Sequence, residues 1–408
     1  MSSSSTHRRR APYARHVASV LVLGAMACKP AASPSPSGEI VETRTSASPE
    51  ADERAPRRPS DGRARADARP LATPPPAPPP ADPIPDDNLP PARPTTLPLR
   101  AGDAADADID AADAAFEQGN MVDAAKALAR ARAKAPQSPG VIATAARLDV
   151  AKASLPTSFG AGKDNAAVVR ALSQLHALVA KHPEYAAASG ELGRLLLVAG
   201  DGPGARDALR SALSALTTQA EIHGNLGLAL LVAGERDAAI AELKRACELD
   251  AGSAPRRGNL ATALLLDGRV DEAVRHYGVQ VKLSPADAHG HSDLGTALLG
   301  TSDLTRAWME LERGVELDGA RATYRSNYGY ALSRAKRPTD AIVQFRKAVA
   351  LDPKLVSGWM NLGIELARNP STRDEGKKAL EKAHALDPND ERVKEVLDEL
   401  KTIAKPTK

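Results

Sequence analysis

The stretch Ala220-Glu221-Ile222-His223-Gly224-Asn225-Leu226-Gly227 recurs along the chain at a fixed distance. Similar octets begin at Ala254, Ala288, Ala322 and Val356, so the register advances by 34 residues each time. A fixed period of this length is typical of stacked helical repeats, in which each unit packs against its neighbours. We therefore interpret the chain of 408 residues as containing an array of repeats, and we do not estimate a number of domains from its length.

Four places in this unit keep the same kind of residue when places are counted from the first residue of each octet. Small residues at the eighth and twentieth places would let two helices approach closely, and large apolar residues at the seventh and twenty-fourth would fill the seam. The seventh place holds Leu192, Leu226, Leu260, Leu294, Tyr328 and Leu362, and the eighth place holds Gly193, Gly227, Ala261, Gly295, Gly329 and Gly363. The twentieth place holds Ala205, Ala239, Ala273, Ala307, Ala341 and Gly376. The twenty-fourth place holds Leu209, Leu243, Tyr277, Leu311, Phe345 and Leu380. The pattern predicts two packed helices per unit.

Glycine and proline mark the expected ends of these helices. Gly200, Gly234 and Gly268 stand where the first helix of a unit would end, because the residue just past a helix often adopts the left-handed conformation. Proline interrupts a helix. It follows the expected second helix as Pro136, Pro183, Pro285, Pro353 and Pro388.

A unit of 34 residues with Leu-Gly early, Ala in the middle and Leu-Asp-Pro late resembles the tetratricopeptide repeat. The resemblance implies an all-α, right-handed superhelix of antiparallel helix pairs with a concave groove that binds proteins. Eight units are predicted within residues 101–390, at 105–138, 139–185, 186–219, 220–253, 254–287, 288–321, 322–355 and 356–390. Residues 391–408 are predicted to contain an amphipathic helix that caps the array.

The second, sixth, ninth and thirteenth places of each first helix share one face, which we call the groove stripe. In the family this face lines the concave surface. Its sixth place holds Asn225, Asn259, Asp293, Asn327 and Asn361. An Asn side chain both donates and accepts, which suits hydrogen bonds to the backbone of an extended peptide. The series resembles the asparagine ladder in the superhelix of O-linked N-acetylglucosamine transferase; the alternative is a role in helix–helix contacts.

The character of the groove stripe changes along the array. Leu228, Val232 and Leu266 make its middle apolar, whereas Arg334 and Arg368 make its carboxyl-terminal end basic. We therefore expect a partner peptide with an apolar stretch followed by an acidic one.

Residues 1–27 have the features of an export signal. Four arginines precede an apolar run at residues 17–26, which is too short to span a bilayer and has the length of a secretory signal core. The following Ala25-Met26-Ala27-Cys28 resembles the lipobox of bacterial lipoproteins, which implies cleavage before Cys28 and a lipid on its thiol. Lys29 after the cysteine implies, by the same resemblance, the outer membrane facing the periplasm. The alternative is an ordinary secretory signal, with Cys28 incidental.

Residues 28–100 are predicted to form a disordered tether. Nineteen of the 32 prolines fall within residues 29–100, which contain no Phe, Tyr or Trp, so this stretch is not expected to contribute to a packed core. Ten basic side chains balance ten acidic ones there. A semi-rigid spacer is favoured over a proline-rich ligand or a wall-binding segment.

Charge and motifs argue against several functional classes. Removing the four arginines of residues 1–27, which contain no acidic residue, changes the formal charge from +3 to −1, so no nucleic-acid partner is expected. P-loop, HExxH and GxSxG motifs do not occur. His289, His291 and Asp293 alternate along one predicted helix and cannot converge on a metal ion. We expect no enzyme activity and no cofactor.

The sequence therefore predicts a non-catalytic scaffold, anchored by lipid in a bacterial envelope, that binds proteins in its groove. By family analogy the partners would belong to pilus, secretion or outer-membrane assembly machines. Two alternatives stay open. In the first, the protein is a structural lipoprotein that contacts itself or the cell wall through its convex face. In the second, it is a regulatory subunit of a glycosyltransferase or cell-wall enzyme.

Overall fold

The computed structural model describes residues 96–403, apart from residue 154 and residues 156–158. The export signal predicted for residues 1–27, the lipidation site Cys28 and the tether up to residue 95 lie outside the described residues.

The described residues form helices joined by turns, with no strand among them. The helices are α2 (Asp106–Glu117), α3 (Met121–Lys134), α4 (Pro139–Ala151), α5 (Ala166–Lys181), α6 (Ala186–Ala199), α7 (Gly202–Leu213), α8 (Ala220–Val232), α9 (Arg236–Leu249), α10 (Ala254–Leu266), α11 (Val270–Leu283), α12 (Ala288–Leu298), α13 (Leu304–Leu317), α14 (Ala322–Arg334), α15 (Pro338–Leu351), α16 (Val356–Ala367), the short 3-10 helix η1 (Pro370–Thr372), α17 (Arg373–Leu386) and α18 (Glu391–Ile403).

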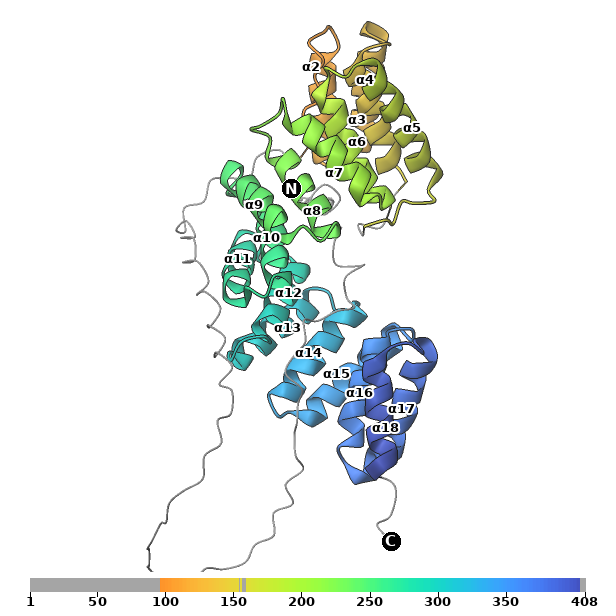
Figure 1. The fold of residues 1–408 in the computed structure, drawn as a ribbon, viewed down its shortest axis with the longest axis vertical. Coiled ribbons are helices and arrows are strands. Elements are labelled where there is room, and N and C mark those ends of the chain that lie inside the picture. Colours follow the sequence, from red (N-terminus) through yellow and green to blue (C-terminus); the bar gives the residue numbers. More distant parts are fainter. Residues whose placement is uncertain (1–95, 154, 156–158, 404–408) are drawn as a thin grey trace, which may run out of the picture. The chain divides into compact units, whose positions relative to one another are not determined.

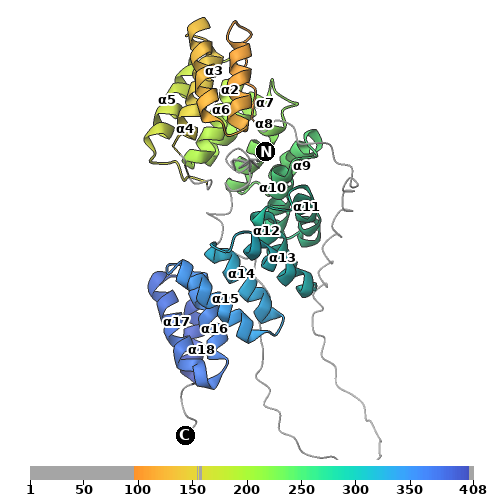
Figure 2. The same cartoon turned by 180° about the vertical axis from the view of Figure 1, so that it is seen from behind.

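These helices pack as successive pairs, from α2 with α3 to α16 with α17 (Figure 1, Figure 2). The second helix of each pair also packs against the first helix of the next pair, and α18 packs on α17. Each of the eight unit ranges inferred from the sequence holds one such pair. The described part of the chain is therefore an all-α solenoid of helix-turn-helix repeats, as predicted.

The glycine at the eighth place is required by close contact between the two helices of a pair. A Cβ atom on Gly227 would lie 2.5 Å from Cγ of Leu243 and 3.2 Å from the carbonyl oxygen of Ala239. The same arrangement recurs at Gly193, Gly295, Gly329 and Gly363. The predicted small-against-large seam between the two helices is thus confirmed.

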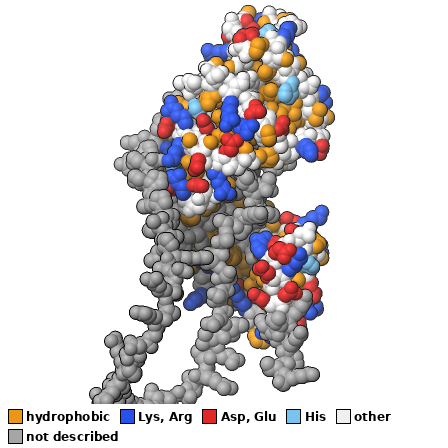
Figure 3. Space-filling view, viewed as in Figure 1, with side chains coloured by type: hydrophobic (Ala, Val, Ile, Leu, Met, Phe, Trp, Pro, Cys, Tyr) orange, Lys and Arg blue, Asp and Glu red, His pale blue; other side chains and the backbone are white. Residues whose placement is uncertain are grey.

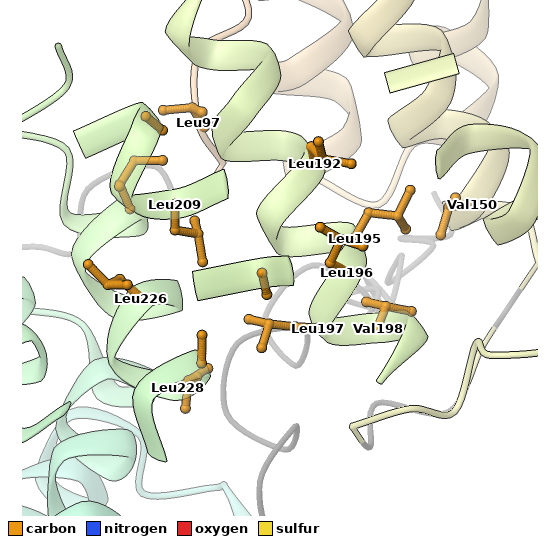
Figure 4. Packing of buried hydrophobic residues seen from close by; sticks show 14 of the residues in the cluster. Leu97, Val150, Leu192, Leu195, Leu196, Leu197, Val198, Leu209, Leu226 and Leu228 are labelled. Carbon is orange, nitrogen blue, oxygen red and sulfur yellow. The ribbon is translucent and has the colours of Figure 1, made fainter. Parts of the chain in front are cut away.

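The core runs along the array as a layer of aliphatic side chains rather than gathering at one centre. One cluster of buried residues extends from Leu97 to Ala307, and Figure 4 shows part of it, including Leu192, Leu195 and Leu209. Two smaller clusters continue the layer through α13 to α18. The packing of each unit therefore depends on its neighbours.

The turns use the predicted residues. Gly200, Gly234 and Gly268 have φ angles of 87°, 79° and 83°, in the left-handed region that ends a helix without steric cost. At the equivalent place in the seventh unit, Lys336 adopts φ 59° although it carries a side chain. The helices that precede the prolines end two residues before them, as α11 does before Pro285.

One expectation about the tether is wrong at its end. Residues 29–100 were expected to add nothing to a packed core, but Leu97 is 4% exposed and Leu99 is fully buried. The physical reason is the alternation Leu97-Pro98-Leu99-Arg100: successive side chains of an extended backbone point to opposite sides, so both leucines face the helices while Pro98 and Arg100 face outward. None of the helices in the described ranges is long and apolar enough to cross a membrane.

Candidate functional site

The sixth-place residues of the groove stripe occupy different surroundings along the array. Asn225 and Asn259 are buried, at 3% and 5% exposure, whereas Asn327 and Asn361 are half-buried. The side-chain amide of Asn225 donates to Oε1 of Glu221 at 2.9 Å, one turn earlier on α8. The side chains at the sixth place therefore differ in how much of their surface an incoming chain could reach.

Two sixth-place side chains have further polar neighbours. The amide of Asn327 donates to Oγ1 of Thr296, which belongs to the groove stripe of the preceding unit, at 3.2 Å. Burial raises the pKa of Asp293 to about 6, although the His289 ring 3.4 Å away opposes this. Below that pH the protonated carboxyl both donates and accepts, as an Asn amide does. The assignment of these residues to partner binding stays a prediction.

The two arginines expected to make the carboxyl-terminal end basic differ in their surroundings. Arg334 is exposed at the end of α14. Arg368 lies 3.1 Å from the buried carboxylate of Glu365, which also accepts from the hydroxyl of Ser333. Part of the basic charge is therefore balanced by a neighbouring carboxylate of the same helix, whereas Arg334 is exposed.

At the other end of the array the groove stripe is already occupied by the chain itself. Residues 96–100 lie in extended form against α2, α4 and α6, and we call them the 96–100 segment. The backbone N–H and the hydroxyl of Thr96 both donate to Oε1 of Glu117, at 3.0 and 2.7 Å. The guanidinium of Arg100 forms a two-pronged contact with Asp110, at 2.7 and 2.6 Å. Glu117 and Asp110 are the thirteenth and sixth places of the first unit.

The carbonyl groups of the two leucines are also held by side chains of the array. Leu97 O accepts from Nη2 of Arg147 at 2.9 Å, and Leu99 O accepts from the Tyr185 hydroxyl at 2.7 Å. Backbone carbonyls are present in every polypeptide, so these contacts recognise an extended chain. The two side chains add sequence preference, since burying a leucine stabilises by roughly 1.5–3 kcal/mol.

Two glycines make room for the 96–100 segment. A Cβ atom on Gly140, at the second place of the second unit, would overlap the carbonyl oxygen of Leu99. A Cβ atom on Gly190 of α6 would lie 2.7 Å from Cδ2 of Leu97. A side chain at either position would therefore displace the segment from the helices.

A buried ionic network lies directly beneath the segment. The Arg147 side chain is 2% exposed and contacts Oδ1 of Asp113 at 2.8 Å and Oε2 of Glu191 at 2.9 Å. Arg194 pairs with the other oxygen of Glu191. The four groups come from the groove stripes of three consecutive units, so they join those units through charge as well as through apolar packing.

The pKa values in this network follow from burial and pairing. Burial by itself would raise the pKa of Glu191, but Arg147 and Arg194 lower it to about 2. Burial raises the pKa of Asp113 despite its contact with Arg147. Burial would lower the pKa of Arg147, yet its two carboxylate partners raise it. At neutral pH Arg147 is therefore charged and keeps a donor on the Leu97 carbonyl.

This occupied part of the stripe was not predicted from the sequence. Three signals were available: the alternation of leucines in residues 97–100, the opposite charges at the ninth places Asp113 and Arg147, and glycine at the second place, Gly140. None of them identifies its partner, because the contacts join residues 50 and 86 positions apart.

The two histidines at the fourth place make contacts within the array. His223 and His291, at the fourth place, are each 7% exposed. Each ring lies near a carboxylate of the second helix, at 2.6 Å for Glu242 and 2.7 Å for Glu310. The other ring nitrogen contacts a carbonyl six residues earlier.

Trp359 uses its indole N–H in the same way as these histidines, toward the Pro353 carbonyl at 2.9 Å. The fourth place thus holds successive units together. As expected, His291 and the neighbouring His289 face different partners. Cys247 is buried, and burial raises its pKa to about 11.

The face of the molecule seen in Figure 3 carries mixed charge. Where described residues are visible on it, basic and acidic side chains are interspersed. A cavity of about 130 Å³ separates the 96–100 segment from α8 and α10. It is lined by Thr96, Pro98, Thr218, Gln219, Ala220, Glu221 and Arg256, so it connects the occupied stripe to the fourth unit.

Comparison with known proteins gives a consistent result for the repeats. Two family models, both described as tetratricopeptide repeat, match the chain, one at residues 99–139, 170–221 and 292–356 and the other at residues 220–252. No curated protein matches the sequence.

Several solved structures are similar to this chain. The structure of the anaphase-promoting complex hetero-tetramer Cut9–Hcn1 is 17% identical, with a TM-score of 0.54, over 73% of this chain and 56% of that one. YrrB, described as a TPR protein with an unusual peptide-binding site, is 21% identical with a TM-score of 0.39, over 47% of this chain and 98% of that one. MamA from Desulfovibrio magneticus RS-1 is 20% identical with a TM-score of 0.39, over 42% and 96%.

Proposed function

Because this chain is a tetratricopeptide repeat protein, we propose that it is a scaffold that binds extended segments of partner proteins along its groove stripe. The observation that carries the proposal is the 96–100 segment. The groove stripe of the first three units holds a length of extended polypeptide by its carbonyl groups and by two leucine side chains.

The later units offer the same kind of contact to a partner. The sixth place there presents amide groups, which pair with both the N–H and the carbonyl of an extended backbone whatever its sequence. Asn327 and Asn361 are half-buried, and exposed Arg334 stands beside them at the thirteenth place. A partner segment with an acidic residue near its end fits this arrangement, because Arg368 is balanced by Glu365 whereas Arg334 projects to solvent.

The role follows from binding rather than from chemistry. Tetratricopeptide repeats serve as protein-binding scaffolds, and the histidines at the fourth place pair with glutamates of the second helix within the array. We propose that Asn225, Asn259, Asp293, Asn327 and Asn361 contribute to partner binding, with the most accessible amides at Asn327 and Asn361 contributing most.

We also propose where the protein is located. The lipobox-like residues 25–28 support a lipid anchor on Cys28 in the bacterial outer membrane, facing the periplasm. The proline-rich stretch after it would let the array reach partners away from the membrane surface. Envelope assembly machines such as pilus or secretion systems are the class of partner that this location favours.

Site-specific crosslinking in the native envelope tests the binding face. A photo-crosslinking amino acid would replace Asn361 in one variant and Lys377, an exposed residue of the second helix α17, in the control. We expect Asn361 to capture a defined partner that Lys377 does not. Equal capture at both positions would contradict binding along the groove stripe.

Metabolic labelling with a radioactive fatty acid tests the anchor. The wild-type chain should incorporate the label and fractionate with membranes, and Cys28→Ser should do neither. Labelling that persists in the variant would exclude Cys28 as the lipidated residue.

A further inference from the structure

The groove stripe of the first three units has a ligand built into the chain. We propose that this part of the stripe is a recognition site for an extended Leu-Pro-Leu-Arg motif, that residues 96–100 fill it, and that a partner segment of the same chemistry binds there only by displacing them. The inference rests on the proposed function, since it assumes that the stripe contacts extended polypeptide, but it adds the motif and the competition.

The apolar part of the motif is defined by two positions that face the same way. Leu97 and Leu99 are both buried, and Pro98 between them is exposed. Leu97 lies against Gly190 and belongs to the same core cluster as Leu192 and Leu209 (Figure 4). A proline at the outward position suits this geometry, because it has no N–H to satisfy and it holds the preceding residue in extended form. The site therefore favours a large apolar residue, a proline and a second large apolar residue.

The polar contacts set direction and length. Glu117 accepts from Thr96, Arg147 and Tyr185 donate to the carbonyl groups of Leu97 and Leu99, and Asp110 pairs with Arg100. The Arg100 and Asp110 side chains are 63% and 39% exposed, so their pair mainly orients the chain. The order of these contacts along the stripe, from Thr96 at Glu117 to Arg100 at Asp110, defines the direction of the bound chain.

Because the 96–100 segment is joined to α2 by a short stretch of chain, it competes strongly with any separate peptide for the site. Residues 101–105 connect it to α2, and the N–H groups of residues 101 and 102 donate to the Asp106 carboxylate at 2.9 and 3.0 Å. A short connection of this kind gives an effective concentration on the order of millimolar. A separate peptide at micromolar concentration is therefore excluded unless the segment is weakened. A longer partner could displace it by also engaging the stripe of the fourth unit, which begins beyond the cavity lined by Thr96 and Glu221.

A peptide-binding assay with the mature full-length chain tests the proposal. The probe is a fluorescein-labelled peptide with the sequence of residues 93–102, and its control has aspartate at both leucine positions. The chain is either wild type or the double variant Leu97→Asp with Leu99→Asp, which prevents the segment from docking but leaves the site intact. We expect fluorescence anisotropy to show at least tenfold tighter binding to the double variant than to wild type, and no binding of the control peptide.

A second variant keeps the test decisive if the double variant does not fold. Arg100→Ala removes only an exposed ion pair and should leave the circular dichroism spectrum unchanged. It is expected to raise probe affinity two- to fivefold over wild type, while Arg245→Gln, which removes an exposed pair on α9, changes nothing. The proposal is overturned if a folded double variant does not discriminate the probe from its control, or, where that variant is unfolded, if Arg100→Ala binds the probe no better than wild type.

The same data separate this inference from the proposed function. Crosslinking from Asn361 reports on the carboxyl-terminal units, which the 96–100 segment does not touch. Partner capture there together with no peptide binding at the first three units would make the segment a structural part of those units and leave the scaffold function in place.

Discussion

Replacing Arg147 with methionine should destabilise the first three repeats more than any other single arginine change in them. Methionine has a similar length and fills the space, so the loss reports on charge rather than on a cavity. The Arg147 side chain is 2% exposed, and Glu191 and Asp113 beneath it are 1% and 12% exposed. Removing one partner of a buried ion pair costs about 3–5 kcal/mol, because the remaining charge is left without compensation.

The pKa of Glu191 gives an independent magnitude. Its value falls from 4.5 to about 2 in the folded protein, although burial alone would raise it, because Arg147 and Arg194 favour the charged form. At about 1.36 kcal/mol for each pH unit, this carboxylate contributes roughly 3 kcal/mol at neutral pH. Arg194 remains in the variant and keeps part of this effect, so the expected loss at pH 7 is about 3 kcal/mol.

The dependence on pH has a definite sign. A carboxyl whose folded-state pKa is depressed adds stability above its ordinary pKa, and that stability is lost as pH falls through the folded value. In the wild type the contribution of Glu191 should decline from pH 4.5 toward pH 2. The difference between wild type and Arg147→Met should consequently shrink to about half between pH 7 and pH 3.

Urea unfolding followed by circular dichroism at 222 nm, at both pH values, measures the difference. Hydrogen exchange of α2, α4 and α6 would show whether the loss is confined to the first three units. Arg245→Gln is the matched control, because its pair with Glu248 is exposed and should contribute less than about 0.5 kcal/mol. A loss below about 1 kcal/mol at pH 7, or a loss of equal size at pH 3, would refute the reasoning.

Three further perturbations follow from the packing. Gly227→Ala should destabilise the fold by about 1–3 kcal/mol in thermal unfolding, because the added Cβ would meet Leu243. The control Gly278→Ala on α11 has room for a Cβ and should be neutral or slightly stabilising. Equal effects of the two changes would contradict the close packing between the two helices of a unit. Lys336→Gly should stabilise by about 1 kcal/mol, because φ 59° is unfavourable for a side chain, and a lower unfolding midpoint would show that the lysine makes compensating contacts. Cys247 should react with iodoacetamide at pH 8 far more slowly than free cysteine, since burial raises its pKa to about 11, and rapid labelling of Cys247 itself in the folded chain, located by peptide mapping, would be inconsistent with that burial.

Much of the fold could be predicted because its rules are local. The 34-residue period places Gly227 opposite Leu243 within one unit, and a contact over 16 positions repeats unit after unit. Left-handed turns at Gly200, Gly234 and Gly268 are likewise local properties of the backbone. The helix pairs, their ends and the packing of small against large residues between the helices could therefore be predicted from the sequence period.

The candidate site was predicted less completely. The sixth-place residues were located on one face from spacing alone, but spacing does not state that Asn225 bonds to Glu221 or that Arg368 is balanced by Glu365. Such contacts depend on rotamers and on neighbouring helices. The accessible end of the stripe at Asn327 and Asn361 was thus not distinguishable from its buried middle.

The sequence by itself determined that the chain folds as repeated helix pairs, since every unit restates the same short-range pattern. Only the tertiary structure decided what happens to residues 96–100. These residues end a proline-rich stretch of the sequence. Stacking of the first three units nevertheless brings Glu117, Arg147 and Tyr185 to one face, where they bind the backbone groups of Thr96, Leu97 and Leu99. Contacts across 50 or more positions have no period, and so they become visible only when the array is assembled.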